Sequence, residues 1–78
     1  MVTREQVRMA RSALGWSIDT LAQNSAVSTR TIKRLEGGEG AITITAANLK
    51  LIVTTLERAG IEFIGAPGEG PGVRYWKK

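Results

Sequence analysis

The chain has 78 residues, of which 11 are Lys or Arg and 7 are Asp or Glu, so its formal net charge is +4 at pH 7. It contains neither cysteine nor histidine, which excludes disulfides and thiolate metal sites and removes the commonest general base. We therefore expect no cofactor, no metal and no enzymatic activity. The basic balance favours a polyanionic partner.

A chain of this length forms one small domain, close to the size at which a single core becomes marginal, and dimerisation is one way to add stability. No apolar run approaches the roughly 20 residues of a membrane span, and the N-terminus lacks the apolar core of a signal peptide. We expect a cytoplasmic protein with no membrane partner.

Residues 3–24 predict two short helices. Thr3 and Gln6 have the form of a capping box, and the helix that they open is expected to end at Gly15. Ser17 is a good N-cap for a second helix, which we expect to end near Asn24.

A third helix is expected from Ser28 to Glu36, with Ser28 as its N-cap and Gly37-Gly38 as its stop. Ile32 and Leu35 would face the core of the domain. The outward residues are a hydroxyl and three cations, Thr29, Arg30, Lys33 and Arg34. A short helix that is buried on one side and cationic on the other suits the major groove of DNA.

Thr45 is expected to cap a fourth helix that ends at Gly60. Its buried stripe has the spacing i, i+3, i+4 and i+7 and consists of Leu49, Ile52, Val53 and Leu56. In the connection before this helix, Ile42 and Ile44 are expected to cover the core, and the alternative is a short strand over this run.

Residues 61–78 have a different character from the helical part. Two runs, Ile61–Ile64 and Val73–Trp76, predict strands, and the glycine- and proline-rich residues between them predict a loop. A two-stranded hairpin is marginal by itself in water, so it needs a surface, either the helices of its own chain or a second copy. We expect a homodimer, formed by Leu51, Ile61, Phe63, Ile64, Val73, Tyr75 and Trp76.

The helical residues resemble the helix-turn-helix domain of Cro and repressor proteins, the XRE-like regulators of phages and bacteria. The resemblance covers about residues 3–60. It rests on Arg11–Ser17 and then on Leu21, Ala22, Val27, Ser28, Thr31, Ile32, Leu35, Glu36 and Gly37. It implies a mainly α fold with four helices at 1–60, followed by a β-strand or hairpin extension at 61–78.

The function that this resemblance implies is sequence-specific DNA binding by a bacterial transcriptional regulator. It would be a repressor-like dimer in the cytoplasm, bound to double-stranded DNA of the nucleoid through its third helix. Because the chain has no room for a separate sensing domain, we expect no small-molecule effector.

The resemblance also assigns roles to positions of the third helix. Arg30 and Arg34 match positions that touch bases, and arginine can bond both O6 and N7 of guanine. Thr29 could reach a base or a thymine methyl. Lys33 would meet phosphate or remain solvated, and Thr31 would pack within the chain or meet phosphate rather than read a base. The expected DNA-binding residues are Ser17, Ser28, Thr29, Arg30, Thr31, Lys33, Arg34 and Gly38. The alternative for Gly38 is that it only ends the helix, and Arg4 and Arg8 are expected to be solvated.

Three further positions follow from the family pattern. Arg11 and Glu36 match an ion pair that orients the third helix without touching DNA. Ala26 stands where relatives usually have glycine with a positive φ, a conformation that costs alanine about 1 kcal/mol. Ile18 replaces a glutamine that often touches phosphate, so this contact would fall to Ser17 and the backbone amides.

One alternative function stays open, a protein-interaction module such as an antitoxin-like partner with a helix-turn-helix fold and little DNA specificity. Such a module has no need of Arg30, Lys33 and Arg34 on one exposed face. The cations therefore favour DNA binding.

Overall fold

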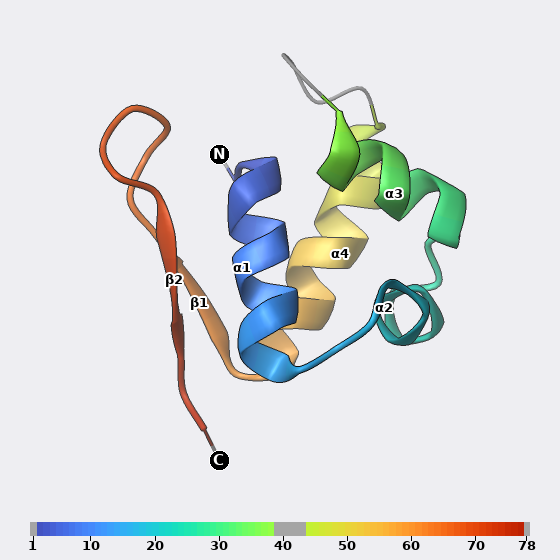
Figure 1. Ribbon diagram of the computed structural model, residues 1–78, viewed down its shortest axis with the longest axis horizontal. Coiled ribbons are helices and arrows are strands. Elements are labelled where there is room, and N and C mark those ends of the chain that lie inside the picture. Colours follow the sequence, from blue (N-terminus) through green and yellow to red (C-terminus); the bar gives the residue numbers. More distant parts are fainter. Residues whose placement is uncertain (1, 39–43, 78) are drawn as a thin grey trace.

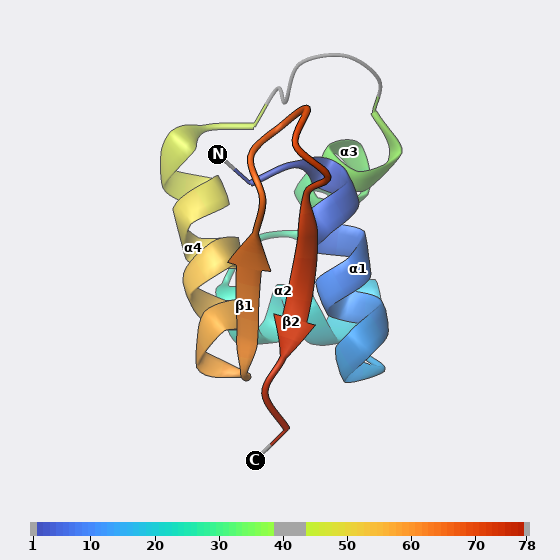
Figure 2. The ribbon, with the colours of Figure 1, turned by 90° about the vertical axis from the view of Figure 1, so that its left-hand side faces the viewer.

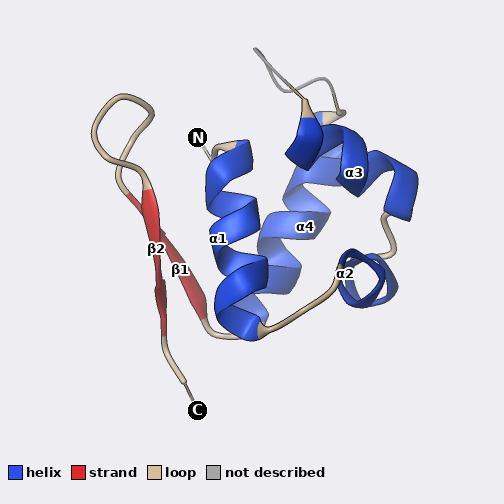
Figure 3. Ribbon diagram, in the orientation of Figure 1, coloured by secondary structure: helices blue, strands red, loops and turns tan. Residues whose placement is uncertain are grey.

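The computed structural model describes residues 2–38 and 44–77, and it is mainly helical with a short β-hairpin at its C-terminal end. The elements in chain order are α1 (Arg4–Leu14), α2 (Ile18–Ser25), α3 (Thr29–Gly37), α4 (Ala46–Arg58), β1 (Ile61–Ile64) and β2 (Gly72–Tyr75), as labelled in Figure 1. Figure 3 shows the same view coloured by secondary structure. Among these described elements, no helix has the length and apolar character needed to cross a membrane.

The elements form three layers. Figures 1 and 2 show α2 and α3 on one side of α1 and α4, and the hairpin on the other side. The buried core is apolar and draws on all four helices, the α2–α3 turn and β1, through Val7, Ala10, Leu21, Val27, Ile32, Leu35, Ile52, Leu56 and Ile61. Because burial of apolar side chains is the main stabilising term in folding, this shared core holds the helices and the hairpin together.

The four predicted N-caps are confirmed. The side chains of Thr3, Ser17, Ser28 and Thr45 each accept a hydrogen bond from the backbone N–H three residues later. At the start of α1 the bonding is reciprocal, because the Gln6 side chain accepts from the Thr3 N–H at 2.8 Å. These bonds satisfy amides that a helix start would otherwise leave unpaired, which explains why local sequence predicts the helix starts well.

The turn between α2 and α3 has the conformation expected from the family pattern. Ala26 has φ 61° and ψ 22°, in the left-handed region, and its N–H donates to Ala22 O at 3.0 Å. Alanine is strained there relative to glycine. The strain is tolerated because Val27 is anchored in the core directly after the turn.

The hairpin begins where predicted and is shifted by one residue at its second strand. β1 pairs antiparallel with β2, in the register Ile61 with Tyr75 and Ile64 with Gly72. The second strand was expected at Val73–Trp76 and instead begins at Gly72, because Gly72 lies opposite the last residue of β1. Trp76 follows the strand, and its backbone N–H still donates to Gly60 O at 2.7 Å.

The hairpin packs on the helices of its own chain, which is one of the two surfaces that the sequence allows for it; the other is a second copy. Ile61 is only 3% exposed and belongs to the core, and Phe63 and Val73 pack against it. The Gln6 side chain on α1 donates to Ile64 O at 3.0 Å and to Gly72 O at 2.9 Å. One face of the hairpin is therefore occupied within a single chain.

Other residues expected at a dimer interface stay open to solvent. Leu51 on α4 is 46% exposed, Tyr75 is 40% exposed and Trp76 is 59% exposed. Ile64 is half-buried. In the connection before α4, Ile44 packs partly against the core as expected, whereas Ile42 lies outside the described residues.

Candidate nucleic-acid interface

α3 presents one apolar and one cationic side. Ile32 and Leu35 are fully buried, whereas the side chains of Arg30, Lys33 and Arg34 are exposed. The spacing of three and four residues between the members of each set places them on common faces of a helix. α3 therefore carries three exposed positive charges on the side that faces away from the core.

Two of the hydroxyl residues expected at this surface, Ser17 and Ser28, are helix N-caps. Ser28 Oγ accepts from the Thr31 N–H at 3.2 Å and donates to Thr31 Oγ1 at 2.9 Å. Ser17 Oγ accepts from the Thr20 N–H at 3.0 Å. Ser17 and Ser28 are exposed, and Thr29 and Thr31 are half-buried. Ser17 and Ser28 therefore fix the first turns of α2 and α3.

Arg11 and Glu36 come together from α1 and from the end of α3. Arg11 Nε donates to Glu36 Oε2 at 2.9 Å, and Arg11 Nη2 donates to Glu36 Oε1 at 2.8 Å. The side chains are 23% and 6% exposed, respectively. Hydrogen bonding to Glu36 and its negative charge raise the pKa of Arg11 above its ordinary value, and this outweighs the opposing effect of partial burial. The two-bond geometry fixes both side chains.

The expectation that Arg4 and Arg8 are solvated is wrong for Arg4 and incomplete for Arg8. Arg4 is 7% exposed, and its Nη1 donates to Leu35 O at 2.8 Å. Arg8 is exposed, yet its Nη1 donates to Glu36 O at 2.8 Å. The spacing of positions 4, 8 and 11 places three arginines on one helix face. This spacing in the sequence could have identified the three as a group, although not the element that they contact.

Gly38 has a structural reason to be glycine. It follows α3 in an extended conformation, with φ −77° and ψ 164°. A Cβ atom at this position would collide with Arg4 Nη1 and would lie 2.9 Å from Arg34 O. A side chain at Gly38 would therefore require the Arg4 guanidinium to move and the Arg34 carbonyl to shift.

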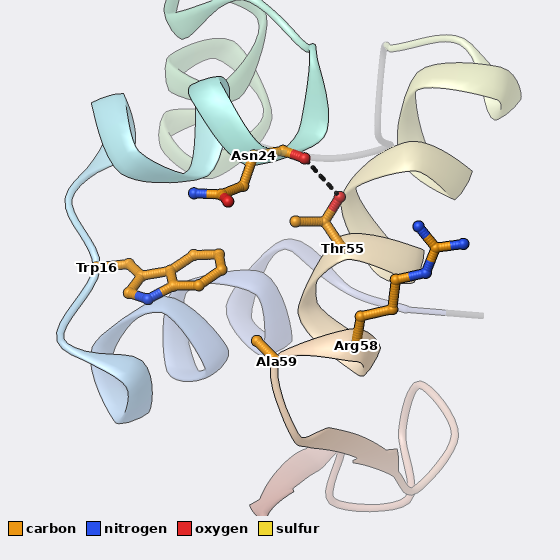
Figure 4. Close-up of a pocket in the computed structure, with 5 residues that line it drawn as sticks. All are labelled: Trp16, Asn24, Thr55, Arg58 and Ala59. Atoms are coloured by element: carbon orange, nitrogen blue, oxygen red, sulfur yellow. Dashed lines mark hydrogen bonds between the residues drawn. The ribbon is translucent and has the colours of Figure 1, made fainter.

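A surface hollow lies at another part of the molecule, between the loop before α2 and the C-terminal ends of α2 and α4. Figure 4 shows its lining, Trp16, Asn24, Thr55, Arg58 and Ala59. The Asn24 amide donates to Thr20 O at 2.8 Å, and the Thr55 hydroxyl donates to Leu51 O at 2.7 Å. Because these polar groups bond within the chain, the hollow offers weaker recognition chemistry than α3.

Neither the search against protein-family models nor the search of curated proteins found a match for the chain.

Proposed function

We propose that this protein is a sequence-specific DNA-binding transcriptional regulator with a Cro/repressor-like fold, which places α3 in the major groove. The observation that carries the proposal is the exposed row of Arg30, Lys33 and Arg34 on a helix whose opposite side is fully buried. A rigid helix with an outward cationic face matches a polyanionic groove that admits one α-helix.

The side chains of α3 divide into two kinds of contact. Arg30 and Arg34 lie one turn apart and are proposed to read guanine through paired hydrogen bonds. Lys33, as a point charge, is proposed to contact phosphate. Ser17, Ser28, Thr29, Thr31 and the backbone near Gly38 are proposed to fix the position of the helix on the DNA.

If the protein binds DNA as a homodimer, the size of the chain limits the spacing of its half-sites. Its Cα atoms span 28 × 28 × 19 Å, and each chain presents one helix α3. Two chains side by side are too short for half-sites two helical turns apart, about 68–72 Å, but they can meet a one-turn spacing of about 34–36 Å. We therefore propose a dimer that binds two successive major grooves on one face of the duplex.

Selection from random DNA, followed by a salt titration, tests the proposal. The full chain should enrich a two-half-site sequence, and the logarithm of its affinity should fall with the logarithm of salt concentration, by about 0.9 per neutralised phosphate. Arg30→Ala should weaken binding to the selected site by about 1–3 kcal/mol and relax preference at one base pair.

Lys50→Gln is a control for lost charge, because Lys50 is exposed on α4 rather than on α3. It should leave the base preference unchanged. A salt-independent response without any enriched sequence would contradict the proposal and favour a protein-interaction module. An equal loss from Arg30→Ala on every sequence would reassign Arg30 to a phosphate contact.

A further inference from the structure

Three arginines of α1 converge on the C-terminal end of α3. Arg4 and Arg8 donate to the backbone carbonyls of Leu35 and Glu36, each at 2.8 Å, and Arg11 binds the Glu36 carboxylate. Positions 4, 8 and 11 follow the helical spacing of one face, so α1 presents the three guanidinium groups as a continuous row. The ion pair is thus only one of three links between α1 and the end of α3.

The end of α3 differs from the ends of α1 and α2. Gly15 and Ala26 adopt the left-handed conformation, and their N–H groups return to carbonyls of the preceding helix. Gly38 after α3 is extended instead. A helix C-terminus leaves carbonyl groups without partners and carries a partial negative charge. At α3, side chains from α1 supply the donors and the positive charge.

Gly38 makes room for this arrangement. Arg4 is 7% exposed although it is an arginine, and its guanidinium occupies the space that a side chain at position 38 would need. The chain therefore combines a buried cation on α1 with a residue directly after α3 that lacks a Cβ atom. Neither feature is required to stabilise α1 alone.

We propose that Arg4, Arg8 and Gly38 form a clamp that sets the angle of α3 against α1. They are positioning residues for base recognition, an inference that rests on the proposed DNA binding. Base contacts need a defined helix orientation, whereas phosphate contacts tolerate small shifts because they carry no sequence information. Loosening the clamp should therefore reduce sequence preference more than affinity for random DNA.

Arg4→Gln tests the clamp with two measurements. The first uses no DNA: residual dipolar couplings report the orientation of N–H vectors of α3 relative to those of α1 and α4. We expect the α3 vectors to reorient while those of α1 and α4 keep their mutual orientation. The second is the ratio of affinities for the selected site and for random DNA. We expect it to fall about tenfold, the effect of one poorly made base contact.

Lys77→Gln is the charge-matched control, because Lys77 is exposed after the hairpin, which lies on the far side of α1 from α3 in Figure 1. It should change neither the couplings nor the ratio. Any loss of affinity for random DNA that both variants share is the effect of removing one positive charge.

Gly38→Ala perturbs the clamp at the residue that Arg4 contacts, and it leaves all charges in place. Its φ of −77° is compatible with alanine, and the Arg4 guanidinium and the Arg34 carbonyl must each shift to admit the new Cβ atom. The variant is a second test of the clamp if Arg4→Gln fails to fold. The new Cβ atom displaces the Arg4 guanidinium, so the affinity ratio should fall again. In the double variant the second substitution should add little, because both act through the same contact. Additive losses would instead assign Gly38 to a direct DNA contact and overturn its place in the clamp.

The two measurements separate this inference from the proposed function. If the wild-type chain shows no sequence preference, the DNA proposal fails, and the couplings still decide whether Arg4 orients α3. If the α3 couplings of folded Arg4→Gln and of Gly38→Ala match the wild type, the clamp is overturned even when DNA binding is confirmed.

Discussion

Glu36 joins α3 to α1 through both its side chain and its backbone carbonyl. Its carboxylate accepts two hydrogen bonds from Arg11, and its backbone carbonyl accepts one from Arg8. Replacing Glu36 with glutamine keeps the shape and removes the charge. Because the Arg11 side chain is 23% exposed, water can solvate its charge when Glu36 is lost, which reduces the destabilisation. We expect the free energy of unfolding to fall by about 1.5–3 kcal/mol, the range for hydrogen bonds to charged groups.

A double-mutant cycle with Arg11→Met measures this coupling by urea denaturation. The double variant should lose less than the sum of the two single variants. The pKa of Arg11 is raised on folding, so the stability that the Arg11 charge contributes is present at neutral pH and is lost only as the pH rises through the folded value in strong alkali. Measurements at neutral pH therefore report the whole coupling. Strict additivity would show that the two side chains do not interact in solution.

The sequence predicts the roles of residues whose hydrogen-bond partners lie only a few positions away along the chain. Each N-cap bonds an amide three residues away, and Ala26 bonds Ala22 within the same turn. Arg4 could not be placed in the same way, because its partner Leu35 lies 31 residues away. Periodicity shows that Arg4, Arg8 and Arg11 share a face, but which element covers that face depends on how α1 crosses α3.

At the scale of elements, Gln6 connects the first helix to the last hairpin. Its Oε1 accepts from the Thr3 N–H, and its Nε2 donates to the carbonyls of Ile64 and Gly72. The side chain is 1% exposed, so water cannot replace these bonds. The sequence predicts the first contact through the capping box. The second contact depends on the three-dimensional position of the hairpin and was missed.

Gln6→Met tests this connection, since methionine fills a similar volume without donors or acceptors. The Ile64 and Gly72 carbonyls lose their donor, which should lower the free energy of unfolding by about 1–3 kcal/mol. Amide hydrogen exchange should accelerate in β1 and β2 more than in α2 and α3, because the hairpin loses its anchor.

Thr3→Ala is the matched control for Gln6→Met. It removes the other half of the capping box and leaves the hairpin contact in place, so it should cost about 1 kcal/mol without selective exchange in the strands. If both variants accelerate exchange in the hairpin equally, the helix start rather than the Gln6 amide holds the hairpin.

At the scale of the whole molecule, the hairpin has one face packed on the core and another face open to solvent. One face completes the core through Ile61, Phe63 and Val73. Beyond that face, Glu62 and Arg74 lie opposite each other, and Trp76 Nε1 donates to Glu62 at 2.8 Å. Composition predicted that the tail needs a surface to lie against, but it did not decide whether that surface is the same chain or a second copy. The contact between the hairpin and α1 settles this for one face only.

Removing residues 61–78 would therefore be a poor test of dimerisation. Such a chain loses Ile61 from the core, and it leaves Gln6, which is nearly inaccessible, without the carbonyls that it bonds. A loss of folding would be indistinguishable from a loss of the dimer. Substitutions at exposed positions avoid this problem.

The proposed dimer is best tested at Leu51 and Trp76, which are 46% and 59% exposed in the single chain. Changing both to glutamine should leave the core intact. Burial of a leucine-sized side chain contributes about 1.5–3 kcal/mol, so the dimer dissociation constant should rise at least about tenfold in sedimentation equilibrium over a range of chain concentrations. Met9→Gln on α1 is the control, since Met9 is similarly apolar and 42% exposed, and it should leave the constant unchanged. A wild-type chain that stays monomeric at every concentration, or a Met9 variant that dissociates as readily, would place the interface elsewhere or remove it.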